Sequence, residues 1–310
     1  MTGDLELAEA ILRARCGDRV RTGFPMAALT TFRIGGPAAL FLQAESSEDL
    51  AAVAEAVRGA GIGFAAVGKG SNILVSDEGF RGLVLRLGRG FRWTSRDGDR
   101  LASGASMPLP ALAGVALTHG LAGLEWGVAI PASFGGAVRM NAGAHGGELS
   151  TLLETIELYD MALGEPVTVK AEDAGFAYRA SALPREGVVI AAQLRLSPGD
   201  REAIRARMDD IREWRRRHQP LAEPNCGSVF KNPPGDFAAR LVDEAGLKGT
   251  AVGGATVSRK HANFIVTSEG THAADVVSLI RTVQERVSER FSIHLEPEVH
   301  LVGEFDRVPH

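Results

Sequence analysis

The sequence predicts an α+β fold in which short strands and amphipathic helices follow one another through three consecutive units. Apolar residues recur at helical spacing in several segments, as at Ile280, Val283 and Val287, which is typical of a helix that buries one face. Short apolar runs bounded by turn residues, such as residues 187–196, are typical of strands. The 37 glycines gather in clusters, and clustered glycine often brings backbone close to another group.

The chain is predicted to begin with an N-terminal segment, residues 1–27, which the first unit, residues 28–88, follows. Residues 5–15 have the spacing of a short amphipathic helix. The elements that we expect in the first unit are a strand-like run and turn over 30–38, a helix around 50–57 that ends at Gly59 and Gly61, and three strands with a glycine loop and a turn over 64–87.

The run SPGD (197–200) is typical of a domain boundary. It divides the second unit, residues 89–199, from the third, residues 200–310. The elements that we expect in the second unit are a strand near 100–103, a helix over 109–119, a glycine-dense stretch over 123–148, and strands over 154–160 and 187–196. The elements that we expect in the third unit are a helix over 201–217 with Ile204, Met208 and Ile211 on one face, a helix around 276–287, and a strand over 291–303.

The composition excludes several classes of protein. A chain of 310 residues with 45% apolar and 23% charged residues is ordinary for a globular protein. Its net charge of −4 gives no general attraction to nucleic acid, and no apolar run approaches the ~20 residues of a membrane span. The two cysteines have no metal-binding spacing, and the acidic N-terminus lacks the apolar core of a signal peptide. We therefore expect a cytoplasmic protein that binds no metal, nucleic acid or membrane.

The first glycine cluster, Gly68-Lys69-Gly70-Ser71, matches neither standard nucleotide-binding loop. A P-loop requires Ser or Thr directly after its Gly-Lys pair, where Gly70 stands. A dinucleotide fingerprint requires a third glycine where Ile73 stands. Two interpretations remain open, a nest of backbone N–H groups that binds an anion and a plain tight turn.

The second glycine cluster lies within residues 130–148, with Asn141 among its glycines. So much glycine is entropically costly in ordinary secondary structure. Either a ligand touches this backbone, or the chain makes a cramped turn between helices. Because two such clusters occur in two separate units, we favour one extended anionic ligand that reaches both.

A basic run, Arg215 to His218, ends the helix expected over 201–217. Cations at the C-terminus of a helix stabilise it through the helix dipole, and we favour this interpretation. Attraction of a phosphorylated substrate is the alternative.

The run NCGSVFKNP, residues 225–233, contains Cys226 and Ser228. Either side chain can act as a nucleophile when a base lies beside it. No histidine lies near Cys226 in the sequence to activate its thiol, and a serine beside a glycine is by default a turn residue. The run taken alone therefore leaves both roles open.

Seven motifs together resemble the UDP-N-acetylenolpyruvoylglucosamine reductases, flavoenzymes of bacterial peptidoglycan synthesis. They occur in the order of that family over about residues 30–303, and they are TTFRIGGPA, VGKGSNILVSDEGFRG, GLEWGVAIPASFGGAVRMNAGAHGGE, FAYRAS, GSVFKNP, AGLKGTAVGGATVSRKHANFIV and LEPEVHLVG. The direct run from GSVFKNP to AGLKG is similar to the shorter subtype of the family, which lacks an inserted substrate-binding loop.

The resemblance implies an FAD-binding module of the vanillyl-alcohol-oxidase type, made of residues 28–88 and 89–199, and a substrate-binding domain, residues 200–310. This module does not use a dinucleotide fingerprint, which agrees with the mismatch at Ile73. FAD would be bound non-covalently. The implied cofactor-binding residues are Val67, Gly68, Lys69, Gly70, Ser71, Asn72, Ile73 and Leu74 around the pyrophosphate, and Ser133, Gly136, Asn141, Ala142 and Gly143 in the second flavin segment.

The resemblance also implies a reaction in two halves. NADPH gives a hydride to FAD, and the enolpyruvyl ether of UDP-N-acetylglucosamine then takes a hydride and becomes UDP-N-acetylmuramate. By position in the motifs, Arg179 and Glu298 would stabilise the enolate that develops, and Ser228 would deliver the proton. The implied substrate-binding residues are Tyr178, Gln219, Lys231 and Asn232. We expect the enzyme to be a monomer.

These residue types suit the implied chemistry. A guanidinium is always charged and can hold a carboxylate at two points, and a serine hydroxyl held beside a carbanion is acidic enough to protonate it. Glu298 would have to be protonated or bonded to the arginine beside so much negative charge. Glu296 shares the strand face with Glu298, so only the family position favours Glu298. The same comparison leaves Cys226 as a small neighbour of Ser228.

Two residues depart from the family pattern. Ala132 stands where glycine is usual, and His145 stands where tyrosine is common. A methyl group at 132 requires a backbone that tolerates it. Both departures concern the local geometry around the flavin and leave the implied reaction unchanged.

Overall fold

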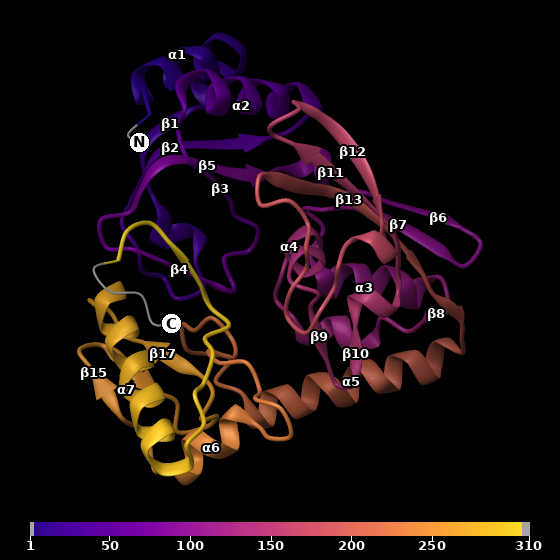
Figure 1. The fold of residues 1–310 in the computed structure, drawn as a ribbon. Coiled ribbons are helices and arrows are strands. Elements are labelled where there is room, and N and C mark those ends of the chain that lie inside the picture. Colours follow the sequence, from indigo (N-terminus) through magenta and orange to yellow (C-terminus); the bar gives the residue numbers. More distant parts are fainter. Residues whose placement is uncertain (1–2, 306–310) are drawn as a thin grey trace. The chain divides into compact units, whose positions relative to one another are not determined.

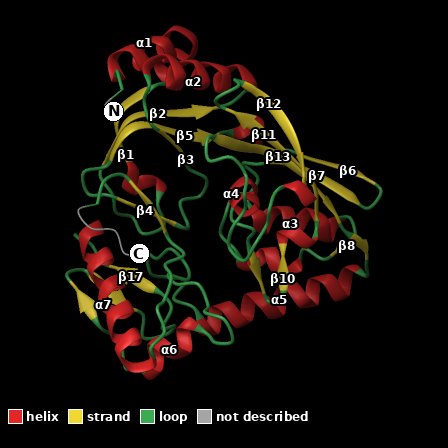
Figure 2. Ribbon diagram, in the orientation of Figure 1, coloured by secondary structure: helices red, strands yellow, loops and turns green. Residues whose placement is uncertain are grey.

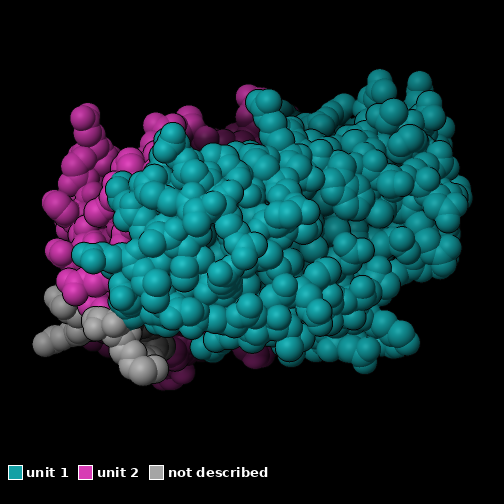
Figure 3. Space-filling model, turned by 90° about the horizontal axis from the view of Figure 1, so that it is seen from above, with its two compact units in different colours: residues 1–22, 40–69, 82–214 teal, residues 23–39, 70–81, 215–310 magenta. Residues whose placement is uncertain are grey.

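A computed structural model describes residues 3–305 of the chain, shown in Figure 1. The chain divides into two compact units, coloured separately in Figure 3. Unit 1 contains residues 1–22, 40–69 and 82–214, and unit 2 contains residues 23–39, 70–81 and 215–310. The outer ends of the predicted segments 1–27 and 200–310, residues 1–2 and 306–310, lie outside the described residues. The predicted domain boundaries stay a prediction.

In unit 1, the first two helices pack side by side on the sheet β1-β2-β5-β3 (Figure 2). Helix α1 begins where the Asp4 carboxylate accepts a hydrogen bond from the Leu7 N–H, and α2 begins where the Ser46 hydroxyl accepts one from Asp49. Both predicted helices are confirmed. The elements are α1 (Leu5–Cys16), β1 (Arg21–Pro25), β2 (Pro37–Ala44), α2 (Ser47–Ala60), β3 (Phe64–Ala66) and β5 (Phe80–Leu87). Residues 23–25, 37–39 and 80–81 of these strands are counted with unit 2.

The rest of unit 1 is built on an antiparallel sheet of order β12-β11-β13-β7-β6. Leu101 and Ile156 from this sheet share a core with Phe134 of α4 and with Ile204 and Met208 of α5, whose predicted apolar face is confirmed. The elements are β6 (Thr94–Asp97), β7 (Arg100–Gly104), α3 (Leu109–Thr118), β8 (Leu121–Ala122), α4 (Phe134–Arg139), β9 (Gly143–Ala144), β10 (Gly147–Glu148), β11 (Leu153–Asp160), β12 (Glu165–Lys170), β13 (Gly187–Arg195), β14 (Ser197–Pro198) and α5 (Arg201–His218).

Unit 2 has its own core, in which the predicted apolar stripe of α7 is buried at Ile280, Val283 and Val287. A small antiparallel sheet has the order β15-β16-β17, and β4 pairs with β18 in parallel. The latter pair joins segments far apart in the sequence. The elements are β4 (Ile73–Val75), α6 (Ala238–Glu244), β15 (Ala251–Val252), β16 (Ala255–Val257), β17 (Ile265–Thr267), α7 (Ala273–Phe291) and β18 (His300–Val302).

Two strand predictions and one helix end need correction. Residues 30–36 form no strand, because Arg33 takes a left-handed φ of 60° and breaks the extended run. Most of residues 291–303 also form no strand, since α7 continues to Phe291 and only 300–302 pair. Gly59 lies inside α2, which ends at Ala60 before the left-handed Gly61.

Candidate functional site

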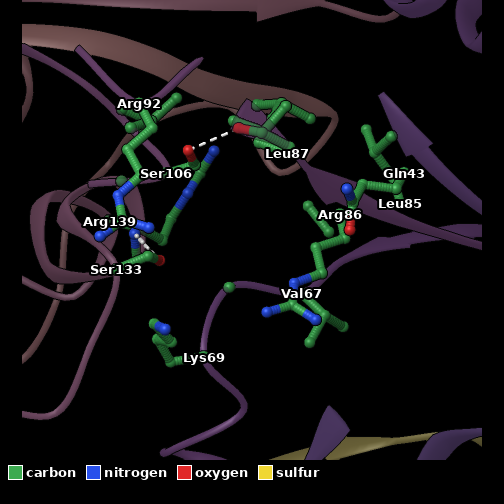
Figure 4. A pocket seen from close by; sticks show the side chains of 18 of the residues that line it. Gln43, Val67, Lys69, Leu85, Arg86, Leu87, Arg92, Ser106, Ser133 and Arg139 are labelled. Carbon is green, nitrogen blue, oxygen red and sulfur yellow. Dashed lines mark hydrogen bonds between the residues drawn. The ribbon is translucent and has the colours of Figure 1, made fainter. Parts of the chain in front are cut away.

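A cavity of about 290 Å³ lies within unit 1, and both glycine clusters contribute to its wall (Figure 4). Val67, Gly68 and Lys69 come from the loop after β3, and Ser133 and Gly136 come from the start of α4. Two segments from separate predicted subdomains therefore meet at one space, as expected for one ligand that reaches both clusters.

Gly68 and Ser133 approach each other so closely that the loop has no room for a larger residue at position 68. A Cβ atom on Gly68 would lie 2.1 Å from the Ser133 Oγ, far inside van der Waals contact. The same hydroxyl accepts a hydrogen bond from the Gly136 N–H at 3.4 Å, which caps α4. The glycine at position 68 is therefore explained by a close approach of backbone to side chain.

Cationic side chains surround this cavity, and none of the aspartates or glutamates within residues 3–305 lines it. Arg139 is held in place, because its guanidinium donates to the carbonyls of Leu183, Pro184 and Gly187. Figure 4 shows Arg139 and Arg92 on one side of the cavity and Arg86 on the other. Within residues 3–305, the side chains of four lining cations form no hydrogen bond or ion pair, and these are Lys69, Arg86, Arg89 and Arg92.

This arrangement fits an anionic dinucleotide such as FAD. Guanidinium groups without a carboxylate partner bind phosphate oxygens well. A cavity lined by backbone of the two glycine clusters suits a long flat ligand. Sequence reasoning missed Arg86, Arg89 and Arg92. The signal was present in RLGRGFR, residues 86–92, where arginine recurs every third residue beside glycines.

The other predicted cofactor-binding residues lie elsewhere. Gly70, Ser71, Asn72, Ile73 and Leu74 belong to unit 2, on the loop before β4 and on β4 itself. Gly70 has a φ of 63°, and a Cβ atom there would lie 1.9 Å from the Leu29 carbonyl oxygen, so a side chain is excluded. The segment 141–143 belongs to unit 1 and is buried, but it is not part of the cavity lining.

The predicted catalytic arginine of unit 1 lies against that segment. The Arg179 guanidinium donates to the Gly143 carbonyl at 2.7 Å. Its Cζ atom also lies 4.9 Å from the centre of the Tyr178 ring, a cation–π distance. The structure thus brings together Arg179, Tyr178 and Gly143, which the sequence had assigned to three different roles.

In unit 2, the segments that carry Ser228 and Glu298 are hydrogen-bonded to each other. The Glu298 N–H donates to the Val229 carbonyl at 2.7 Å, and the Lys231 N–H donates to the Glu296 carbonyl at 2.9 Å. The Asn72 side chain donates to the Glu298 carbonyl at 3.1 Å. These backbone contacts bring the predicted proton donor and the predicted glutamate into one part of the unit.

Glu296 and Glu298 have different surroundings. The Glu296 side chain is 67% exposed and forms an ion pair with Lys231 at 2.6 Å, whereas Glu298 is partly buried. Burial, and next the charge of Glu298, raises the pKa of the Cys226 thiol. Cys226 is 3% exposed, so it remains a neutral, inert thiol, as expected of a small neighbour.

The remaining substrate-side predictions fall on structured ends of helices. The Asn232 side chain accepts a hydrogen bond from the Ala238 N–H at 3.0 Å, at the start of α6. The Gln219 side chain accepts one from the Arg215 guanidinium at 2.8 Å, just after α5. Of the basic run, Arg216 to His218 are exposed at this helix end, which agrees with complementing the helix dipole.

The two departures from the family pattern are accommodated. Ala132 does not take a positive φ, and its carbonyl accepts a hydrogen bond from the Leu109 N–H at 2.9 Å. His145 has a φ of 50°. Its ring lies 5.1 Å from the Trp214 ring in an edge-to-face arrangement. A methyl group and an imidazole therefore both find places in this part of unit 1.

Residues 3–305 contain neither a helix that could cross a membrane nor a cluster of side chains that could hold a metal ion. None of the helices there is long and apolar enough to cross a membrane. That part of the chain also has no group of three or more His, Cys, Asp or Glu side chains that could hold a metal ion.

Known proteins match the chain over nearly its whole length. Residues 38–170 match the family model "FAD binding domain", and residues 219–302 match "UDP-N-acetylenolpyruvoylglucosamine reductase, C-terminal domain". A UDP-N-acetylenolpyruvoylglucosamine reductase of Heliobacterium modesticaldum is 46% identical, over 90% of this chain and 90% of the relative. One of Anaeromyxobacter sp. is 45% identical, over 98% of this chain and 94% of the relative.

A solved structure also resembles the whole chain. The crystal structure of the UDP-N-acetylenolpyruvylglucosamine reductase of Thermus caldophilus has a TM-score of 0.80 and 38% identity, and the match covers 92% of this chain and 99% of that one. Together with the mixed helices and strands, these matches confirm the predicted α+β fold with an FAD-binding module and a C-terminal domain.

Proposed function

The chain belongs to the UDP-N-acetylenolpyruvoylglucosamine reductase family and is an FAD-dependent oxidoreductase of peptidoglycan synthesis, and from this premise we propose its substrates and the roles of its residues. It reduces the enolpyruvyl ether of UDP-N-acetylglucosamine to UDP-N-acetylmuramate, with NADPH as the hydride donor. The observation that carries this proposal is the hydrogen-bonded pairing of the Ser228 and Glu298 segments. The family reaction needs both side chains at one carbon.

FAD would be held by the cavity of unit 1. When bound, it supplies the transfer of a hydride from NADPH to the enolpyruvyl group. Lys69, Arg86 and Arg92 would hold its negative charge, and the glycine backbone at 68 and 136 would lie close to it. Gly70 to Leu74 of unit 2, which the resemblance assigns to the cofactor, remain proposed cofactor-binding residues.

Arg179 would stabilise the negative charge that develops on the substrate. Reduction of the enolpyruvyl group places charge on the carbon that bears the carboxylate, and a fixed cation aimed there lowers the barrier. The hydrogen bond to Gly143 and the cation–π contact with Tyr178 keep the guanidinium oriented before substrate arrives.

Ser228 would deliver the proton that neutralises this charge, and Glu298 would stabilise the same enolate as a hydrogen-bond donor in its protonated form. General acid catalysis of this kind requires the donor within hydrogen-bond reach of the carbon. The left-handed φ of 81° at Gly227 turns the chain immediately before Ser228. Glu296 is excluded from the role of Glu298 in this proposal, because its carboxylate is paired with Lys231.

Four residues would bind the sugar nucleotide. Lys231 carries a charge that suits the diphosphate, while Tyr178, Gln219 and Asn232 supply hydrogen bonds or stacking. Three of these, Gln219, Lys231 and Asn232, already take part in hydrogen bonds that hold their side chains in place. We further propose that the enzyme acts as a cytoplasmic monomer.

A visible absorption spectrum and a turnover assay test the function together. We expect purified protein to contain non-covalent FAD and to oxidise NADPH only when the enolpyruvyl sugar nucleotide is present, with UDP-N-acetylmuramate as product. Protein that takes up no FAD contradicts the proposal. Steady hydrogen peroxide production coupled to substrate oxidation would identify an oxidase instead, and binding without NADPH oxidation would identify a nucleotide-sugar binder.

A further inference from the structure

Both polar atoms of the Asn141 side chain form hydrogen bonds within unit 1. Its amide nitrogen donates to the Ala177 carbonyl at 3.0 Å, and its amide oxygen accepts from the Ser150 N–H at 2.9 Å. The residue is 1% exposed. Because a carbonyl only accepts and an N–H only donates, these partners fix the orientation of the amide.

Ala177 is the first residue of a tight turn that has Arg179 near its tip. The N–H of Ala177 donates to the Ala180 carbonyl at 3.0 Å, and the N–H of Ala180 donates back at 3.1 Å. Arg179 has a φ of 55°. This left-handed conformation costs a residue with a side chain about 1 kcal/mol, and it persists only where the surroundings hold it.

Hydrogen bonds from Asn141, Arg179 and Ser181 hold this turn against the segment 139–143. The Ser181 hydroxyl donates to the Arg139 carbonyl at 2.7 Å, after the turn, and the Arg179 guanidinium donates to Gly143. The Asn141 bond acts at the base of the turn, on the carbonyl of Ala177, before Arg179. Asn141 itself has a φ of 43°, which asparagine tolerates better than most residues.

We propose that Asn141 is a positioning residue for Arg179, which fixes the backbone from which the guanidinium projects. This inference rests on the role proposed above for Arg179. The Asn141 side chain would then serve the protein backbone instead of the cofactor, since both of its polar atoms bind backbone groups. Loss of the Ala177 bond should therefore impair the step in which charge develops on the substrate, and it should spare the binding and reduction of FAD.

The test is Asn141→Asp in the FAD-loaded enzyme, with the two half-reactions followed separately by stopped-flow absorbance. A carboxylate still accepts from Ser150, but it repels the Ala177 carbonyl. We expect flavin oxidation by the enolpyruvyl sugar nucleotide to slow on the order of 100-fold, as a displacement of about 1 Å would cause. Flavin reduction by NADPH and the FAD content should match the wild-type enzyme.

The pH profile separates positioning from general damage. A protonated carboxyl donates as an amide does, so flavin oxidation by Asn141→Asp should recover, relative to the wild type, as the pH falls. Gln193→Glu is the matched control, because it makes the same amide-to-acid change on β13, where Gln193 donates to Glu154. In this control variant, flavin oxidation by the sugar nucleotide should be neither slowed nor dependent on pH in a way that differs from the wild type.

Each outcome bears on one proposal. If Asn141→Asp oxidises at the wild-type rate, or if it loses FAD or slows both half-reactions equally, Asn141 does not position Arg179. If Arg179→Gln measured in parallel leaves flavin oxidation unchanged, the proposed role of Arg179 itself fails. Should Asn141→Asp not fold, Asn141→Gly takes its place, because glycine adopts the same φ; it should show the slow step without recovery at low pH.

Discussion

The backbone N–H of Glu298 donates a hydrogen bond of 2.7 Å to the carbonyl of Val229, the residue that follows Ser228. The Lys231 N–H makes the corresponding bond to Glu296, and Phe230 and Pro297 pair between them. A run near residue 230 and a run near residue 297 are thus held in register, although 60 or more residues separate them in the sequence. This register brings the backbone next to Ser228 alongside the backbone of Glu298.

Ser228→Ala should therefore affect only one half-reaction. Without the hydroxyl, the carbanion lacks its proton donor, and we expect flavin oxidation by the sugar nucleotide to slow about 10²- to 10⁴-fold. Flavin reduction by NADPH should stay within about twofold, because no substrate carbon is protonated in that step. Stopped-flow absorbance of the flavin measures both rates. An equal fall in the two rates would contradict the assignment of Ser228 as proton donor.

Cys226 is the other candidate nucleophile in the run 225–233, and its burial in the structure predicts that it is inert. Cys226→Ala should leave turnover within a few-fold and reduce stability by about 1 kcal/mol, the usual effect of removing a small buried group. In native protein at pH 8, Cys226 should react with iodoacetamide far more slowly than after unfolding in urea, since burial raises the pKa of its thiol. Loss of activity in Cys226→Ala would restore a catalytic role to the thiol.

The raised pKa of Cys226 also predicts how stability depends on pH. The thiol is neutral in the folded protein but ionises in the unfolded chain above its ordinary pKa of about 8.5. Stability is therefore unaffected by this group below about pH 8.5 and falls as the pH rises further, with a contribution of about 1.4 kcal/mol per pH unit. Urea unfolding of wild type and Cys226→Ala between pH 7 and about 10 measures the difference. Parallel curves for the two proteins would contradict it.

The sequence predicted the elements with strong periodicity and missed those set by distant contacts. Helices α1, α2, α3, α5 and α7 and the long strands β11 and β13 lie where apolar spacing placed them. At 30–36 Phe32 and Ile34 are buried in alternation, but Arg33 is left-handed and the predicted strand does not form. Period-two burial arises in irregular chain as well, so alternation over a few residues does not establish a strand.

The sequence motifs predicted which residues belong to the site, but they could not predict the contacts that these residues make. The motifs predicted that Ser228 and Glu298 act together, but no local pattern could show the register that joins them, because it comes from long-range pairing. Spacing left Glu296 and Glu298 equivalent, and the ion pair of Glu296 with Lys231 is a difference that supports the proposed role of Glu298. The proposed role of Asn141 depends on hydrogen bonds to positions 150 and 177, which lie 9 and 36 residues further along the chain.

Gly68→Ala tests the close approach in the cavity wall. The added Cβ atom would lie 2.1 Å from the Ser133 Oγ, so the loop or the serine must move. We expect FAD affinity to fall at least about tenfold, which corresponds to about 1.4 kcal/mol. Fluorescence titration of apoprotein with FAD measures it. Adding Ser133→Ala should restore part of the affinity, because it removes the colliding oxygen.

Gly114→Ala is the matched control for that substitution. Gly114 lies within α3, and a Cβ atom there meets nothing within 4 Å. Alanine should therefore stabilise the helix by about 0.5–1 kcal/mol and leave the affinity for FAD unchanged. If Gly68→Ala binds FAD as tightly as Gly114→Ala does, the cavity is not the cofactor site.

Arg86→Gln and Arg92→Gln test whether the cations of the cavity hold the diphosphate of FAD. Neither side chain forms a hydrogen bond or ion pair within residues 3–305, so each substitution removes charge without breaking an internal contact. We expect a several-fold loss of FAD affinity for each variant, about 1 kcal/mol, and a weaker dependence of affinity on salt. Arg185→Gln, an exposed arginine of unit 1 outside the cavity lining, should bind FAD normally. Equal affinity and salt dependence in all three variants would place the diphosphate elsewhere.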